Sequence, residues 1–166
     1  MKDKEFKLHI CNFFPESLFV ETYGRDVFEL IKTEAFRKDL KKCAGCGYEP
    51  RTQEGKDKDI FVHIYSVDKE NPANSKGRCL CSACHSTQHI VSSLERGLVV
   101  FVNSSFSQAD LVRGCRSGNI SGMFKDNQII KLKKSPEKFR QEFFSGDYKI
   151  SNSLKVIFTD NFKFEF

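Results

Sequence analysis

Apolar residues follow two different periods in the first quarter of the chain. Phe6, Leu8 and Ile10 alternate with polar residues, and a β-prone run follows over 17–23, so this region predicts two strands. From 26 to 41 the apolar residues recur at steps of three and four, which predicts a helix. The residues expected on its buried face are Val27, Leu30, Ile31, Ala35 and Phe36.

The same criteria predict further strands and helices along the rest of the chain. A β-prone run over 59–65 predicts a strand, the polar segment 68–77 predicts a long loop, and 85–94 predicts a helix. This mixture of element types predicts an α+β fold. The elements expected after them are a buried strand over 97–102, a serine-capped helix from 105–107 to 118, a strand over 129–132, a helix opened by Ser135–Pro136 and ending at Gly146, and a last strand within 153–166.

The composition is that of a soluble, folded protein. The 166 residues are 39% hydrophobic and 30% charged, and the chain contains 17 Phe but no Trp, so phenylalanine rings are expected to fill much of the core. Neither a bilayer-spanning apolar run nor a secretory signal is recognisable, which predicts a cytoplasmic protein without membrane insertion. The net charge of +5 permits contact with nucleic acid, but the basic runs over 37–42 and 131–134 are expected to be solvated faces.

Two C-x-x-C pairs carry the strongest chemical signal. Cys43 and Cys46 form one pair, and Cys81 and Cys84 form the other, which is the spacing of a four-thiolate zinc site. Zn²⁺ suits such a site because it prefers tetrahedral geometry and binds sulfur well. Disulfides or free thiols are the alternative, but a reducing compartment and the odd count of seven cysteines favour a metal. Cys79 could replace Cys81 in the shell, although the regular spacing favours Cys81.

The other cysteines and one histidine are expected to be packing residues. His9 and Cys11 lie in the first predicted strand, where no neighbour shares a metal-ligand spacing with them. Cys115 falls on the helix after Ser107 and is expected to be a small core residue.

The region from 36 to 94 resembles the HNH, or ββα-metal, nuclease superfamily. The features that carry the resemblance are a basic helix end over 36–39, the first cysteine pair followed by glycine, a strand with Val62-His63-Ile64, and the second cysteine pair followed by His85. In zinc-stapled members of that superfamily the four cysteines are structural, and a second, catalytic metal ion is held on the strand pair and the helix. The length predicts one domain over 1–166. Within it, the resemblance implies a zinc-bound HNH-like core over 36–94, preceded by N-terminal strands and a helix over 1–35 and followed by a Phe-rich C-terminal α/β extension over 95–166.

Carried over residue by residue, this resemblance implies an endonuclease site. His63 matches the general base that deprotonates an attacking water. His85 and His89 lie four residues apart, so on a helix they share one face and could hold Mg²⁺ or another divalent ion. Asn74 matches the family's supporting Asn, whereas Val62 stands where the family places a metal ligand. Because the ligand set is incomplete, the alternative for His63 is a locally hydrogen-bonded residue on a strand, and the alternative for His85 and His89 is a solvated helix face beside the cysteine site.

A second resemblance covers more of the chain. The segment 36–48, the C-x-C-x-x-C arrangement over 79–84, and the strand and helix over 97–111 are similar to the non-catalytic, HNH-like DotN or IcmJ family of type IVB (Dot/Icm) secretion machines. In that family the catalytic histidines are lost, and the zinc fold is an adaptor that binds a segment of the coupling ATPase. This chain departs from the pattern because it keeps its histidines.

These patterns lead to three hypotheses of function. The favoured one is a zinc-binding, non-catalytic adaptor that binds the coupling ATPase of a type IV secretion system and associated adaptor subunits, helps recruit effector substrates, and is brought to the inner membrane by a partner. The alternative is an HNH endonuclease that cuts DNA with a divalent ion at His63, His85 and His89. The third is a zinc module that binds nucleic acid without cutting it, which only the basic charge supports.

Overall fold

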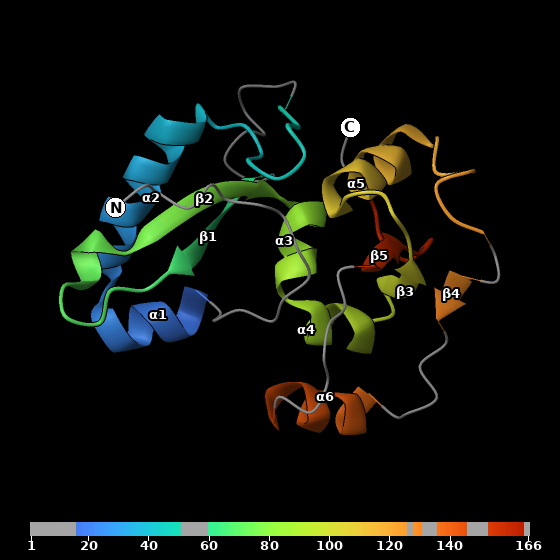
Figure 1. The fold of residues 1–166 in the computed structure, drawn as a ribbon. Helices are drawn as coiled ribbons and strands as arrows, with labels where there is room; N and C mark the ends of the chain where they lie inside the picture. The colour runs from blue at the N-terminus through green and yellow to red at the C-terminus, as the bar shows by residue number, and fades with distance from the viewer. Residues whose placement is uncertain (1–15, 51–59, 126–127, 131–135, 146–152, 165–166) are drawn as a thin grey trace.

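The computed structural model describes residues 16–50, 60–125, 128–130, 136–145 and 153–164 (Figure 1). As the sequence predicts, this part of the chain mixes helices and strands. In chain order the elements are α1 (Glu16–Tyr23), α2 (Arg25–Asp39), β1 (Ile60–Ser66), the short 3₁₀ helix η1 (Pro72–Asn74), β2 (Lys76–Cys81), α3 (Ser82–Gln88), α4 (Ile90–Glu95), β3 (Val99–Asn103), α5 (Gln108–Ser117), β4 (Ile129–Ile130), α6 (Pro136–Ser145) and β5 (Leu154–Phe158).

The first half of the structure is a β-hairpin covered by α2. Strands β1 and β2 pair antiparallel from Ile60 opposite Cys81 to Ser66 opposite Lys76, with an irregularity near the hairpin end. Helix α2 lies against β2, and this close approach requires a glycine at position 77. A Cβ atom there would lie only 2.9 Å from Cγ2 of Ile31 on α2. Strand β1 confirms the prediction for 59–65.

The segment 17–23 is helical, so the prediction of a strand there is wrong. Phe19 and Tyr23 lie one turn apart on α1 with their ring centroids separated by 4.9 Å, and Phe19 also packs against Phe28 of α2. Burial of Phe19 in this way outweighs the β propensity of its aromatic and β-branched neighbours. The strand predicted around Phe6 to Ile10 lies outside the described residues.

Helix α2 matches the predicted span closely but buries a different face. Phe28, Ile31 and Ala35 are buried, whereas Leu30 is 62% exposed. The prediction was wrong about Leu30 because the packing of α1 and β2 rotates the buried face toward Phe28.

Two predictions between the cysteine pairs and beyond them need correction. The segment 68–77 is not all loop, because η1 and the start of β2 lie within it. The strand β2 has few strong strand-forming residues, so its pairing with β1 determines its conformation. The single helix predicted over 85–94 is instead two short helices, α3 and α4, separated at His89, whose φ of −125° and ψ of 54° are not helical.

The second half of the structure is a three-stranded antiparallel sheet in the order β4-β3-β5. The predicted strand over 97–102 and the helix after Ser107 are confirmed as β3 and α5; Ser107 accepts a hydrogen bond from the backbone N–H of Asp110, and Gly118 ends the helix with a φ of 73°. The described parts of the predicted elements at 129–132 and after Ser135 are also confirmed, as β4 and α6. The last strand, β5, ends before Phe162 and Phe164, whose alternation with charged residues is part of the basis for predicting a strand within 153–166.

Phe162 and Phe164 form an aromatic cluster with Phe158, the last residue of β5, instead of continuing the strand. The rings of Phe158, Phe162 and Phe164 lie 4.5 to 5.4 Å apart, and all three pack against the core of the first half. Figure 1 shows α3 and α4 between the hairpin and the three-stranded sheet, and α3 contacts both hairpin strands and α5. The two halves therefore meet around α3, directly beside the second cysteine pair.

Candidate metal centre

Four cysteine sulfurs converge where the two halves meet. Cys43 and Cys46 lie on the loop after α2, Cys81 is the last residue of β2, and Cys84 lies in the first turn of α3. One sulfur from each residue lies within 4.8 Å of the other three, and all four side chains are buried. The cluster could hold one metal ion such as zinc.

The spacing of the sulfurs fits a tetrahedral ion. The Sγ atoms of Cys46 and Cys81 are 3.7 Å apart. A tetrahedron with Zn–S bonds of about 2.3 Å has edges of about 3.8 Å, so this one distance is close to such an edge. Four sulfur donors also favour a thiophilic ion over Mg²⁺ or Ca²⁺, which bind oxygen.

The loop that carries the first pair is held by backbone hydrogen bonds around Cys43. The Cys43 N–H donates to the carbonyl oxygen of Tyr48 at 2.8 Å, and the Gly47 N–H donates to the carbonyl oxygen of Cys43 at 2.8 Å. The Cys46 N–H points at the Cys43 sulfur from 3.5 Å. Gly47 has a φ of 79°, a conformation that glycine adopts without strain. This tight turn brings both sulfurs to the same side of the loop.

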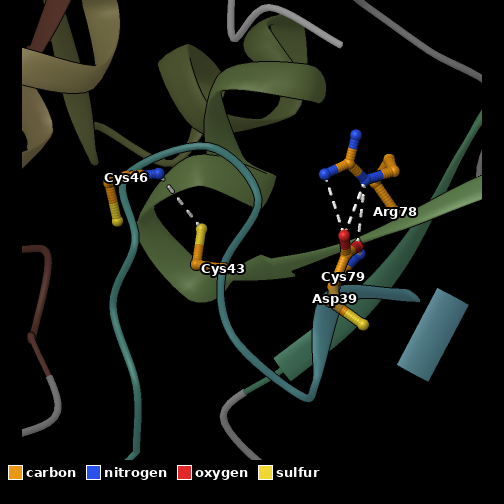
Figure 2. Close-up of polar contacts among 5 residues, drawn as sticks. All are labelled: Asp39, Cys43, Cys46, Arg78 and Cys79. Atoms are coloured by element: carbon orange, nitrogen blue, oxygen red, sulfur yellow. Dashed lines mark hydrogen bonds and ion pairs between the residues drawn. The ribbon is translucent and has the colours of Figure 1, made fainter. Parts of the chain in front are cut away.

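A buried ion pair fixes this loop to the hairpin. The carboxylate of Asp39, at the end of α2, accepts hydrogen bonds from the Arg78 guanidinium at 2.8 Å and from the Cys79 N–H at 2.7 Å. Figure 2 shows these contacts, with the Cys79 sulfur pointing away from the loop of Cys43 and Cys46. The Ala44 N–H also donates to the Cys79 carbonyl oxygen at 2.7 Å. The predicted solvated face over 37–42 is thus wrong for Asp39.

Cys79 and Cys115 are not part of the cluster. Cys79 is fully buried, and desolvation raises the pKa of its thiol to about 12, so it is a neutral packing residue. Cys115 is half-buried on α5, and burial also raises the pKa of its thiol. The structure therefore brings Cys81 to the other sulfurs in place of Cys79.

The four thiols cannot all ionise without a cation among them. Hydrogen bonds from the other three thiols, Cys46 first, lower the pKa of the Cys43 thiol. The contact with Cys43 raises the pKa values of Cys81 and Cys84, and burial adds to this. Like charges at such short separation repel strongly, so a bound divalent ion is what would turn all four thiols into thiolates.

The structure also brings together three of the four residues of the endonuclease hypothesis. His63 lies on β1, His85 on α3, and His89 directly after α3. The Nε2 atoms of His85 and His89 are 3.2 Å apart, and the ring of His63 meets that of His89 edge-on with centroids 6.4 Å apart. Asn74 lies elsewhere, on η1, where it borders a hollow with Leu30 of α2.

The histidine cluster borders a narrow hollow, with His63 buried and His85 and His89 half-buried. His63 is 3% exposed, and Phe61 stacks on the ring of His85 at 4.9 Å. Desolvation, followed by the neighbouring His89 and His63, lowers the pKa of His85 to about 3, so its imidazole is neutral at pH 7. The hollow beside the three rings leaves about 10 Å³ for solvent, room for about one water molecule. Its other walls include Val62, Ile64 and Phe28, with Glu16 at the edge.

A much larger cleft opens on the other side of the cysteine loop. Its volume is about 820 Å³, and it lies between the loop over 46–49 and helix α5. Its lining includes Tyr48, Phe106, Asp110, Arg113 and Arg116. Sequence patterns do not indicate this cleft, because its two sides are more than 50 residues apart in the chain.

The comparisons with known proteins give no family for the chain. Neither the models of known protein families nor the curated protein sequences contain a match to it. Within the described ranges, no helix has the length and apolar character that a membrane span requires.

Proposed function

We propose that this protein is a zinc-stapled, HNH-like adaptor without catalytic activity, which binds a partner protein through the cleft beside its cysteine cluster. One structural Zn²⁺ would be held by Cys43, Cys46, Cys81 and Cys84. The order hairpin, then helix, with one cysteine pair at their junction, supports an HNH-like core, because that arrangement is the one the resemblance implies.

The contrast in size between the two hollows carries the proposal. The histidine hollow leaves about 10 Å³, so a phosphodiester has no room beside His63, whereas the cleft beside the cysteine loop has about 820 Å³. Val62, an apolar residue, lines the histidine hollow at the position where the nuclease family has a metal ligand. A protein with a closed histidine cluster and an open cleft is better suited to bind a partner than to cut DNA.

The partner proposed on the resemblance is the coupling ATPase of a type IV secretion system, together with its associated adaptor subunits. The protein would work in the cytoplasm, reach the inner membrane through that partner, and help to recruit effector substrates. Phe106 is 42% exposed at the cleft, and an exposed aromatic ring is a frequent anchor of protein interfaces.

The test is direct binding between the purified full chain and the purified coupling ATPase from the native host, measured by calorimetry. Wild type should bind, and Phe106→Asp should bind about tenfold more weakly or worse, because a charge replaces an apolar anchor. Leu30→Asp is the matched control, since Leu30 is also an exposed apolar residue but lies on α2. Absence of binding by a folded, zinc-loaded wild type would overturn the ATPase as partner, and equal binding by all three proteins would overturn the cleft as its site.

One observation favours the endonuclease as a second candidate. Two imidazole nitrogens lie 3.2 Å apart with a third histidine ring nearby, and two such nitrogens could act as ligands of a divalent ion. If this candidate is correct, the chain nicks plasmid DNA in the presence of the ion, and His63→Ala abolishes the nicking because the general base is lost. Nicking that persists in His63→Ala would exclude this site as its source.

A further inference from the structure

One cation from the second half of the structure contacts the cysteine cluster. Arg116, near the end of α5, donates a hydrogen bond from Nη2 to the sulfur of Cys81 at 3.4 Å. It is 35 residues away from Cys81 in the sequence. No spacing rule for metal ligands includes such a residue, because its proximity arises only when α5 packs beside α3.

Two aromatic rings hold the Arg116 guanidinium in place. Its central carbon lies 3.8 Å from the ring centroid of Tyr48, on the cysteine loop, and 5.2 Å from that of Phe164, after β5. The guanidinium is planar and less strongly hydrated than an ammonium group, so it can stack between rings and still donate hydrogen bonds. Three segments distant in the sequence therefore fix one cation against one sulfur.

The loaded site has a charge that such a cation would offset. Four thiolates with one divalent ion carry a net charge of about −2, and all four side chains are buried. Buried charge is unfavourable unless an opposite charge or hydrogen bonds compensate it. Arg116 places its side-chain cation directly on one of these sulfurs.

We propose that Arg116 is a positioning residue of the metal centre, whose guanidinium stabilises the thiolates and so raises the affinity for the metal. The proposal rests on the metal site of the proposed function. It goes further, because it makes metal binding and the attachment of α5 to the cysteine loop interdependent. Hydrogen bonds to metal ligands from such outer residues commonly change metal affinity by about 10- to 100-fold.

The chain offers a matched control on the same helix. Arg113 lies one turn before Arg116 and borders the same cleft, but it donates to the carbonyl oxygen of Cys46 at 3.3 Å and pairs with Asp110. Arg113→Gln thus removes one positive charge near the site without removing a contact to sulfur. Arg116→Lys keeps the charge and loses the planar, stacked geometry.

The experiment measures the affinity of the full chain for Zn²⁺ by competition with a chromophoric chelator, and the absorption of the Co²⁺-substituted proteins. Relative to wild type, we expect R116Q to bind Zn²⁺ about 10- to 100-fold more weakly, R116K to lose less, and R113Q to change less than about twofold. The sulfur-to-cobalt charge-transfer band of R116Q should move to longer wavelength, because its thiolate has lost a hydrogen bond. A purely structural role of Arg116 would not move this band.

The possible outcomes distinguish a failure of the Arg116 role from a failure of the metal site itself. A wild type that binds neither Zn²⁺ nor Co²⁺ would contradict the metal site itself. Zn²⁺ affinities of R116Q and R116K within about twofold of wild type would overturn the role of Arg116 and leave the metal site intact. If R116Q does not fold, R116K decides: a weaker affinity with an altered cobalt spectrum supports the proposal, and wild-type values contradict it.

Discussion

The cysteine cluster and the histidine cluster belong to the same hairpin and helix, yet their surroundings differ in charge. Beside the cysteines, Arg116 contacts a sulfur and the buried pair of Asp39 and Arg78 fixes the loop. Around the histidines the walls are mostly apolar, and the burial of His85 keeps its imidazole neutral. Neighbouring ligand types are therefore not sufficient for a charged metal site, because the protein must also compensate the charge and leave space for any substrate of the metal.

The two clusters also differ in the ion pairs that lie next to them. The Asp39 and Arg78 side chains are 4% and 19% exposed. By contrast, the Glu16 side chain, at the edge of the histidine hollow, and that of its partner Arg25 are 49% and 59% exposed. A buried pair that also satisfies a backbone N–H is costly to break, and an exposed pair is screened by water. The cysteine side is thus built to hold one fixed geometry.

The largest expected effect is that of removing a cysteine ligand. Cys84→Ser should abolish metal binding and unfold the first half, because the free energy of a structural zinc site, about 10–16 kcal/mol in small zinc domains, is free energy of folding. Thermal melting followed by circular dichroism, with zinc content measured on the same sample, checks this. Wild type treated with a chelator should melt in the same way and recover on addition of Zn²⁺. A cooperative melt of Cys84→Ser at the wild-type temperature would show that the cluster has no structural metal.

The second-largest expected effect compares how much each of the two ion pairs contributes to the free energy of unfolding. Asp39→Asn leaves Arg78 as a largely buried cation without its carboxylate, so the free energy of unfolding should fall by about 3 kcal/mol. Glu16→Gln, the matched control, should lower it by less than about 1 kcal/mol, because both partners are exposed. Urea denaturation of the two variants measures the difference. Equal losses would mean that the cysteine side is not held more firmly than the histidine side.

The smallest expected effect distinguishes Cys79 from Cys81. Cys79→Ala should keep one metal ion per chain and lower the free energy of unfolding by about 1 kcal/mol, because only a small buried side chain is trimmed. Cys81→Ala should lose the ion. Elemental analysis of both variants measures the metal content. Loss of the metal in Cys79→Ala would mean that Cys79 is a ligand, contrary to this assignment.

The sequence was most informative where a short-range rule applies. The C-x-x-C spacing predicts which sulfurs converge, since each pair closes through a local turn or the first turn of a helix. The ends of α5 follow from Ser107 and Gly118 for the same reason, because a cap involves only neighbouring residues.

The predictions failed where distant contacts decide the structure. Residues 17–23 have strand-like propensity but form α1, because Phe19 packs on Phe28. The roles of Asp39 and Arg116 depend on partners that are 39 and 35 residues away. Asp39 is an acidic residue within the basic run 37–42, and this contrast was a local sign that it has a specific partner. No local pattern distinguishes Arg116 from other basic residues.

The most direct test of the account is the metal content of wild type and of a double variant, His85→Ala with His89→Ala, measured by elemental analysis after purification in the presence of zinc. We expect one zinc per chain in both proteins, because the four cysteines are the group of potential ligands that converges within the described residues. A second ion in wild type that is lost in the double variant would contradict this expectation. In that case the histidines form a metal site, and the endonuclease becomes the better proposal.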